Sequence, residues 1–518
     1  MKLVYIDDKF IVLEVDVHQQ LHAFLRDQGA SRWPHDLSVA RLVARALRLQ
    51  RSALIQVSAA AQYRGHYRCS YLAPLLLWPD PVILVAPEPV QQQLLQIEIP
   101  RLSEWLGFKK PVCTAQQWPG PHFTGLLMLS PQEWLERPHA CLEGLTLIDG
   151  VDALEDWTRQ YLTLSITPQD WEQLRWCYPH QQTLLRGARA KLTRSLFQHP
   201  PNPYTYTLLT DGERQILDLL HHDLKSCDLS MSPKSWQQFW QQSAQPDQIL
   251  WSQIDRQQGS FAIHCAPANI QPYLLTRWEQ KTVVLLGQGS DVEATARVYE
   301  QTLGVKDVTC IQFGADRHTE AIQLYLPDGL PMPNTPEFQT RIVAQLHELL
   351  ALSRGMGRPT VLIIDDLPLK AQIATLLASE YGSRVQVETS ELNPDSILVT
   401  GWEYWLRVQG DVPSPPLLII ATLPIPSLED PRVAGRVAYY KRRRQDWFRL
   451  YLLPQALRML QNAIAPAREQ QGIVALLDAR VLHRSYGQQI LDAISPYARI
   501  NYLDASLFEE AVSLIDRI

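Results

Sequence analysis

The chain has 518 residues, of which 46% are hydrophobic and 20% charged, a composition that is typical of a globular protein with about three domains and excludes a largely disordered chain. Its formal net charge of −6 excludes a general attraction for phosphate, so any affinity for nucleic acid must come from a local basic surface. No segment reaches the ~18 consecutive apolar residues of a membrane span, and two Asp residues near the start argue against a secretory signal, so we expect a cytoplasmic protein without a membrane partner.

Continuous apolar runs predict two groups of short strands. Because these runs do not alternate with polar residues, they are typical of parallel strands that are buried on both faces. Helical periodicity between them, for example at 90–106 and 337–353, indicates that strands and helices alternate in two doubly wound α/β lobes. The strands are expected at 53–57, 82–86, 126–129 and 145–149 in the first group and at 282–287, 360–365, 396–401, 417–422 and 472–478 in the second.

The stretch between the two groups of strands has helical periodicity and no comparable strand run. We therefore predict an α/β fold in which two parallel-sheet lobes, at 1–150 and 281–518, are separated by a helical insertion at 151–280. The segment 198–207 is rich in Pro and Asn and is predicted to be a loop within the insertion.

The last hundred residues carry an ordered series of motifs. LPIPSLEDP follows the strand at 417–422, and LPQALRMLQ, GIVALLDAR and Tyr486-Gly487 come after it in that order. This series resembles the end of the DinG/XPD family of superfamily 2 DNA helicases. Residues 82–102 are similar to the strand and helix after the phosphate loop of that family, and residues 145–156 stand at its Asp-Glu-Ala-His box. The resemblance implies two RecA-like lobes, ATP and Mg²⁺ as cofactors, DNA as the partner, and a role in DNA repair or replication.

The cysteines do not support the iron–sulfur domain of that family. No two of the seven are closer than 28 residues, a spacing that fits neither a zinc pair nor an iron–sulfur run. We expect reduced cysteines, no metal, and a deleted or reduced iron–sulfur domain. The residues are Cys69, Cys113, Cys141, Cys177, Cys227, Cys265 and Cys310.

The phosphate loop of the family is altered. Its Gly-Lys-Thr corresponds to Gly65-His66-Tyr67 in one register and to His66-Tyr67-Arg68 in another, and neither contains the lysine that contacts the β- and γ-phosphates. Three consecutive alanines before it would crowd a phosphate. The segment is predicted to be a turn filled by side chains, with replacement of the lysine by Arg64 or Arg68 as the alternative.

The acidic box is also altered. The resemblance implies that Asp149 would hold Mg²⁺ through water, but Gly150 replaces the glutamate that orients the attacking water. Asp152 stands at the histidine that couples the nucleotide to the second lobe. Asp149 is therefore predicted to have a capping or hydrogen-bonding role, with a catalytic role as the alternative.

The last helicase motif has lost its arginine finger. Gln461 and Arg468 remain as the outer residues, but Ala465 stands at the finger and Pro466 is expected to interrupt the helix. Loss of an arginine finger costs ~10³–10⁵ in turnover. We therefore expect an inactive ATPase.

Residues 432–449 form a concentrated basic and aromatic segment. Lys and Arg neutralise phosphates and aromatic rings stack on unpaired bases, so the segment favours binding of a single strand. The alternative is a solvated helix whose aromatic residues pack inward. The residues are Arg432, Arg436, Lys441, Arg442, Arg443, Arg444 and Arg449, with Tyr439, Tyr440, Trp447 and Phe448 between them.

Three functions stay open. We favour a protein on a helicase frame that binds nucleic acid, single-stranded DNA above all, without efficient ATP hydrolysis and without a cofactor. The second is an active ATP-dependent helicase with divergent motifs, which would need ATP and Mg²⁺. The third is a scaffold that binds a protein partner and neither nucleotide nor nucleic acid.

Overall fold

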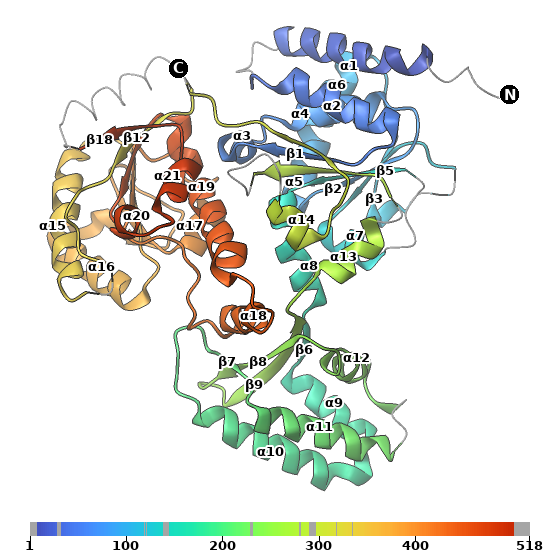
Figure 1. Ribbon diagram of the computed structural model, residues 1–518, viewed down its shortest axis with the longest axis vertical. Helices are drawn as coiled ribbons and strands as arrows, with labels where there is room; N and C mark the ends of the chain where they lie inside the picture. Colours follow the sequence, from blue (N-terminus) through green and yellow to red (C-terminus); the bar gives the residue numbers. More distant parts are fainter. Residues whose placement is uncertain are drawn as a thin grey trace.

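The structure is a computed structural model that describes residues 8–27, 33–118, 120, 122–137, 144–227, 231–278, 281–289, 297–317, 319–333 and 335–501. The elements form three bodies, a first lobe, an insertion and a second lobe (Figure 1). Cys141 lies outside the described residues. In the described ranges, none of the helices combines the length and the apolar character that crossing a bilayer requires.

The first lobe contains a sheet of seven parallel strands. Five of them are buried along their whole length, as their continuous apolar runs predict. In spatial order the strands are β11 (Thr309–Gln312), β1 (Ala53–Val57), β10 (Val283–Gln288), β5 (Leu145–Asp149), β2 (Val82–Val85), β4 (Leu126–Leu129) and β3 (Val112–Thr114).

Helices cover both faces of this sheet. One face packs on α1 (Asp8–Asp27), α2 (Asp36–Leu49), α4 (Arg68–Leu77), α5 (Glu88–Gln93) and α6 (Ile99–Leu106), and the other on α7 (Pro131–Glu136), α8 (Leu154–Leu162), α13 (Gln271–Trp278) and α14 (Arg297–Leu303). The short helix α3 (Ala59–Arg64) follows β1 directly. A π-helical segment, Leu94–Glu98, joins α5 to α6, so the helix predicted at 90–106 is confirmed.

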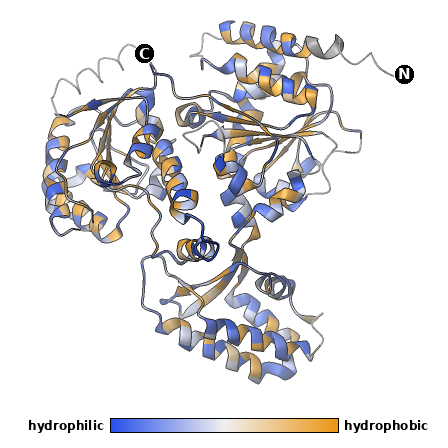
Figure 2. Cartoon of the chain, in the orientation of Figure 1, coloured by the Kyte–Doolittle hydropathy of each residue, from blue (hydrophilic) through white to orange (hydrophobic). Residues whose placement is uncertain are grey.

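The second lobe has the same construction. Its parallel strands are β14 (Val385–Val387), β15 (Ile397–Thr400), β13 (Thr360–Ile363), β16 (Leu417–Ile420), β17 (Ile473–Leu476), β12 (Ile322–Tyr325) and β18 (Tyr497–Ile500). Its helices are α15 (Glu337–Leu352), α16 (Leu367–Tyr381), α17 (Trp402–Val408), α18 (Pro431–Arg442), α19 (Leu453–Glu469), α20 (Arg480–His483) and α21 (Gly487–Ala493). In both lobes the strands are hydrophobic and the outer helix faces are hydrophilic (Figure 2). The predicted pair of doubly wound lobes is confirmed.

The insertion is not purely helical, so this part of the prediction is wrong. It packs α9 (Pro168–Cys177), α10 (Gln182–Gln198), α11 (Asp211–Lys225) and α12 (Lys234–Ser243) on one face of an antiparallel sheet ordered β6 (Leu164–Ile166), β9 (Ser260–Pro267), β8 (Gln248–Asp255) and β7 (Tyr206–Leu208). Two of these strands have only three residues, and in most of β9 buried residues alternate with partly buried ones. Such strands lack the continuous apolar run that marked the others.

The boundary expected at 281 is also wrong. β10 lies between β1 and β5 in the first sheet, and β11 pairs with β1, so the second sheet begins only at β12. An apolar run predicts that a strand is buried, but it does not state which sheet the strand joins. The chain returns from the insertion to complete the first lobe before it enters the second.

Pro466 does not interrupt α19, in contrast to the expectation. The helix runs from Leu453 to Glu469 and includes this proline in its last turn. Proline removes one main-chain donor and disturbs the preceding turn. Near the end of a long buried helix this loss is small compared with the packing that α19 gains.

The helix α18 lies where the three bodies meet (Figure 1). Tyr439 of α18 packs with Ile249, Trp251 and Ala266 on the face of the insertion sheet that α9 to α12 leave open. A Cβ on Gly435 would lie 2.6 Å from the Ile249 side chain, so the absence of a side chain permits this close approach.

We expect the stability of the fold to depend on pH through Asp36, the first residue of α2. Its Oδ1 accepts a hydrogen bond from the Ser70 hydroxyl at 2.5 Å, and burial raises the pKa of its carboxyl from 3.8 to about 6. Because the folded state binds this proton more tightly than the unfolded chain does, ionisation of Asp36 costs up to about 3 kcal/mol of stability as the pH rises from 4 through 6.

We expect the Asp36→Asn variant to escape that cost. Relative to wild type, it should melt at the same temperature near pH ~4 and at a higher temperature near pH ~7.5. Differential scanning calorimetry at the two pH values measures this difference. A melting difference that does not change with pH would contradict the assignment.

Candidate functional site

The position of the family's phosphate loop is occupied by α3. The Ser58 hydroxyl caps this helix and accepts a hydrogen bond from the Ala61 amide at 3.2 Å. Gly65 ends it with a φ of 67°, the left-handed conformation that favours glycine. A Cβ there would lie 2.5 Å from the Arg68 guanidinium, and His66 beyond it is exposed. Helix and side chains therefore fill the turn.

The two arginines that were candidates to replace the missing lysine have partners elsewhere. The Arg64 guanidinium lies 2.8 Å from the Glu469 carboxylate on α19 of the second lobe. Arg68 is buried, donates to the Gln93 side-chain oxygen at 2.5 Å and lies 3.7 Å from Glu98. Both guanidiniums are thus engaged by side chains of the protein itself, Arg64 across the two lobes and Arg68 within the first lobe.

Asp149 ends β5 and is buried, with 4% of its surface exposed. The Tyr67 hydroxyl donates a hydrogen bond to its Oδ1, and the Tyr71 hydroxyl donates to its Oδ2 at 2.8 Å. Burial raises the pKa of the Asp149 carboxyl and the pKa of both phenols. The two phenols therefore remain protonated donors, and both oxygens of the carboxylate are engaged by side chains of one helix and its N-terminal end.

Asp152 and Gln461 stand at the contact between the lobes. The Asp152 carboxylate accepts hydrogen bonds from the Gln62 side chain at 3.0 Å and from the Gln288 amide at 3.1 Å. Its main-chain carbonyl accepts a hydrogen bond from Arg458 of α19. The Gln288 side chain donates to the Gln461 side-chain oxygen at 2.6 Å. Both residues thus make direct contacts between the two lobes.

Arg468 is held by main-chain hydrogen bonds inside the second lobe. It is 3% exposed, and its guanidinium donates to four main-chain carbonyls, those of Glu320, Ile494, Ser495 and Pro496. Burial lowers the pKa of Arg468 to about 10. The guanidinium therefore ties the end of α19 to the segments that lead into β12 and β18.

A small cavity lies between the lobes beside α3. Its volume is about 170 Å³, below the range of about 300–1,000 Å³ that is typical of small-molecule sites. Its lining includes Ser58, Ala59, Gln288, Gly289, Gln461 and Arg468.

Arg436 was predicted to contact nucleic acid, and this is wrong. The residue is 7% exposed, forms an ion pair with Glu155 of the first lobe, and lies 3.6 Å from the centre of the Tyr451 ring. It belongs to the inward face of α18, so it binds the lobes together. Arg432, one turn earlier, is held by Asp430 at 2.7 Å.

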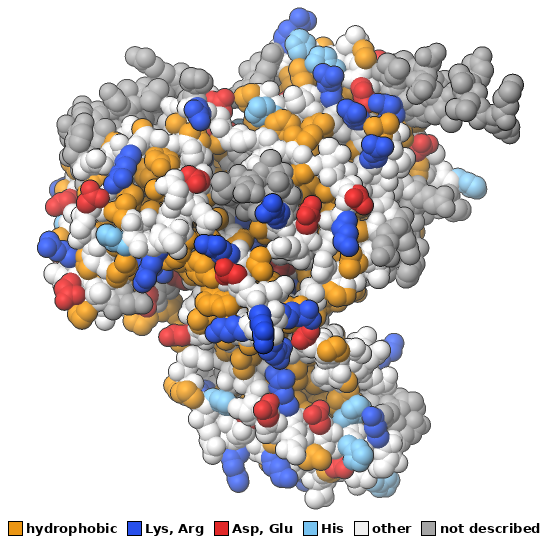
Figure 3. Space-filling model, viewed as in Figure 1, with side chains coloured by type: hydrophobic (Ala, Val, Ile, Leu, Met, Phe, Trp, Pro, Cys, Tyr) orange, Lys and Arg blue, Asp and Glu red, His pale blue; other side chains and the backbone are white. Residues whose placement is uncertain are grey.

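The other cations of the segment remain on the surface. Arg442 and Arg443 lie 3.4 and 2.8 Å from Asp247, and their side chains are still 65% and 52% exposed. The Lys441 ammonium lies 5.4 Å from the centre of the Trp447 ring. Figure 3 shows Lys and Arg side chains gathered where the insertion meets the lobes. We define the basic patch as Lys441, Arg442, Arg443, Arg444 and Arg449 with Trp447.

Several residues of the site were missed in the sequence. Tyr71 follows Tyr67 by four positions, a helical spacing that places both side chains on one face and could have suggested a shared partner. Glu155 and Asp247 carried no such signal, because they lie 281 and 196 positions from Arg436 and Arg443.

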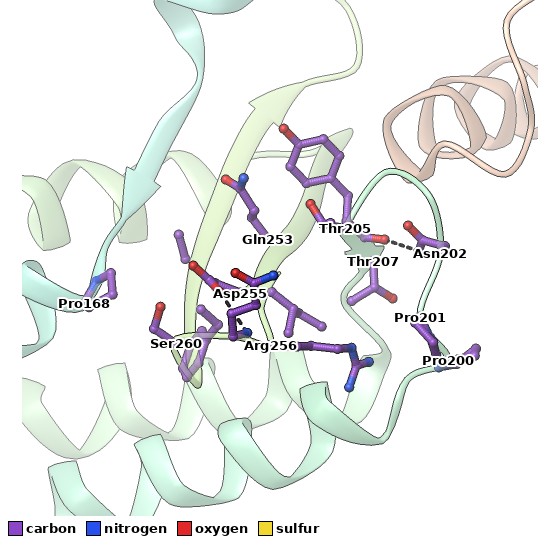
Figure 4. A pocket seen from close by; sticks show the side chains of 15 residues that line it. Pro168, Pro200, Pro201, Asn202, Thr205, Thr207, Gln253, Asp255, Arg256 and Ser260 are labelled. Carbon is purple, nitrogen blue, oxygen red and sulfur yellow. Dashed lines mark hydrogen bonds between the residues drawn. The ribbon is translucent and has the colours of Figure 1, made fainter. Parts of the chain in front are cut away.

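A larger cavity, of about 580 Å³, lies in the insertion at the tip of the β8–β9 hairpin (Figure 4). Pro200, Pro201 and Asn202 form one side of it, and Gln253 and Asp255 lie across from them. The described residues contain no group of three or more His, Cys, Asp or Glu that could hold a metal ion.

Comparison with known proteins agrees with this architecture. Residues 414–497 match the model of the helicase C-terminal domain. An apo XPD structure is 13% identical with a TM-score of 0.56, and the match covers 89% of this chain and 100% of that one. The Xpd4 structure from S. tokodaii is 11% identical with a TM-score of 0.56, over 90% and 100% of the two chains. A third structure, an XPD helicase, is 13% identical with a TM-score of 0.52, over 96% and 100%. No curated protein sequence matches the chain.

Proposed function

We propose that this XPD/DinG-like superfamily 2 helicase chain binds single-stranded nucleic acid, DNA above all, and does not hydrolyse ATP efficiently. The proposal rests chiefly on Asp149, whose two carboxylate oxygens accept hydrogen bonds from Tyr67 and Tyr71. In an ATPase that carboxylate must be free to bind the water shell of Mg²⁺.

The surrounding residues do not fit ATP–Mg²⁺ either. A phosphate needs main-chain amides that point into a glycine-rich loop, a lysine, and a hydroxyl for the metal. Here the Ser58 hydroxyl accepts from its own helix, and Gly65 caps that helix. We therefore propose that the chain works without a nucleotide cofactor, without a metal and without an iron–sulfur cluster.

The basic patch supports the nucleic-acid part of the proposal. Its five cations lie on the surface near the half-buried Trp447, in a chain whose net charge is −6. Exposed Arg and Lys with an aromatic ring suit a flexible strand with unpaired bases, because cations neutralise phosphates and the ring stacks on bases.

Titration of labelled single-stranded DNA with the triple variant Arg442→Ala, Arg443→Ala, Arg444→Ala tests the patch. Loss of three phosphate contacts should weaken binding about tenfold or more and reduce the slope of log Kd against log salt by about 2. The matched control is Arg186→Ala, Lys191→Ala, Arg194→Ala on the exposed side of α10, which removes the same charge at a distance from α18. Equal affinity and slope in both variants would contradict the assignment.

Phosphate release in the presence of single-stranded DNA, together with the thermal shift caused by nucleotide, tests the loss of ATPase. We expect turnover at background and no shift. DNA-stimulated turnover that disappears in Asp149→Asn would establish the second function, an active helicase with divergent motifs. If the chain neither binds DNA nor turns over ATP, the third function, a protein scaffold, replaces our proposal. The cytoplasmic location stays a prediction.

A further inference from the structure

The two lobes touch through side chains of their own at three separate places. The first is the position of the absent phosphate loop, where α3 packs against α19. There the Tyr63 hydroxyl donates to the Gln409 carbonyl at 2.6 Å, and Arg64 pairs with Glu469 at 2.8 Å. The helix that fills the loop position therefore also makes the contact with the second lobe.

The second place is at the carboxyl ends of the central strands β5 and β10 of the first sheet. Arg458 of α19 donates to the Asp152 carbonyl, and the Gln288 side chain donates to Gln461 of the same helix at 2.6 Å. These bonds join the ends of β5 and β10 to one face of α19. They are short polar contacts that tolerate little separation of the lobes.

The third place is a buried charge cluster between α8 and α18. The Glu155 carboxylate is bound by Arg436 of the second lobe and by Arg159 of its own helix at 3.1 Å. The Glu155 and Arg436 side chains are only 12% and 9% exposed, and the Tyr451 ring covers Arg436 at 3.6 Å. Separation of the lobes would leave Arg436 without its carboxylate and Glu155 with Arg159 alone, and loss of one partner from a buried charge cluster is costly.

Burial alone would raise the pKa of Glu155, but the guanidinium of Arg436 and then those of Arg159 and Arg458 lower it to about 2. The carboxylate therefore keeps its charge throughout the neutral range, and its attraction to Arg436 is constant there. The third contact is thus not a switch that ordinary pH changes would release.

We propose that the chain holds its two lobes in one closed arrangement permanently, by the contacts at α3, at the carboxyl ends of β5 and β10, and at Glu155, so that the lobes do not open and close in response to ATP. A ligand can shift a conformational equilibrium only by its different affinity for the two states. Here the chain's own residues supply the closing contacts. The basic patch at the end of α18 and in the segment after it is then presented on a fixed frame, and a bound strand stays in one place.

Hydrogen exchange of the full chain, with small-angle scattering on the same samples, tests this inference. In wild type we expect the same protection of α3, α8 and α19, and the same radius of gyration, with and without ATP–Mg²⁺. The Arg436→Met variant should raise amide exchange in α8 and α19 by about tenfold or more and increase the radius, while the strands of both sheets keep their protection.

Arg449→Met is the matched control, because it removes an exposed arginine of the same region whose partner Asp446 is also exposed. It should leave exchange and radius unchanged. Equal behaviour of the two variants, or a change of wild-type radius or α3 protection on addition of ATP–Mg²⁺, would overturn the inference. If Arg436→Met also exposes the sheets, the wild-type comparison with ATP–Mg²⁺ still decides. No readout here uses nucleic acid, so failure to bind DNA would contradict the proposed function alone.

Discussion

The Asp149→Ala variant is expected to lose about 3–5 kcal/mol of stability in the first lobe, because two buried phenol hydroxyls lose their acceptor and a cavity remains. Asp149 is 4% exposed, and Tyr67 and Tyr71 are buried with it. The variant should therefore melt well below wild type or fail to fold. Thermal and urea unfolding followed by circular dichroism measure this loss.

Asp149→Asn is the control for that experiment. The amide keeps an oxygen that accepts from one tyrosine, and its nitrogen can donate to the other hydroxyl, so we expect a loss of only about 1 kcal/mol. A helicase active site makes the opposite prediction, since there the aspartate serves Mg²⁺ and its replacement removes turnover while the fold survives. An Asp149→Ala variant as stable as wild type would show that the two tyrosines do not depend on this carboxylate.

The Arg468→Met variant is expected to lose about 3 kcal/mol of stability in the second lobe, because a guanidinium that donates to four main-chain carbonyls is removed from a buried position. Burial of the charge has its own cost, as the lowered pKa of Arg468 shows. The loss of the donors outweighs the relief of that cost, since methionine offers no donor to the carbonyls that remain inside.

Replacement of Arg468 by Lys should retain part of this stability, because an ammonium can donate to three of the acceptors but cannot span them as a planar group does. Melting temperatures in the order wild type, Arg468→Lys, Arg468→Met are the expected result. If all three proteins melt together, Arg468 does not tie α19 to the segments that lead into β12 and β18, and a role at the interlobe cavity would have to be tested instead.

The site shows what residue identity can and cannot predict. The residue types alone were enough to predict that the phosphate loop, the acidic box and the arginine finger differ from those of the family, because each group of the ATPase needs a particular side chain. The residues that now contact these motif positions became apparent only from the tertiary structure. Tyr71, which engages Asp149, and Glu155, which neutralises Arg436, stand in no motif of the sequence. Arg436 and Arg442 lie six positions apart in one basic segment, yet one is buried and the other is exposed.

The fold, too, was predictable in part from local sequence and in part only from the tertiary structure. Local sequence patterns predict burial, because a continuous apolar run must avoid water wherever it lies. The strands of both lobes were therefore predictable from such runs, and the helices at 90–106 and 337–353 from helical periodicity. Pairing depends on residues far apart in the chain. β10 pairs with β1 and β5 although the whole insertion separates it from them in the chain, and the short strands of the insertion are stabilised by pairing with one another. No local pattern carries that information, since main-chain donors and acceptors are the same in every strand.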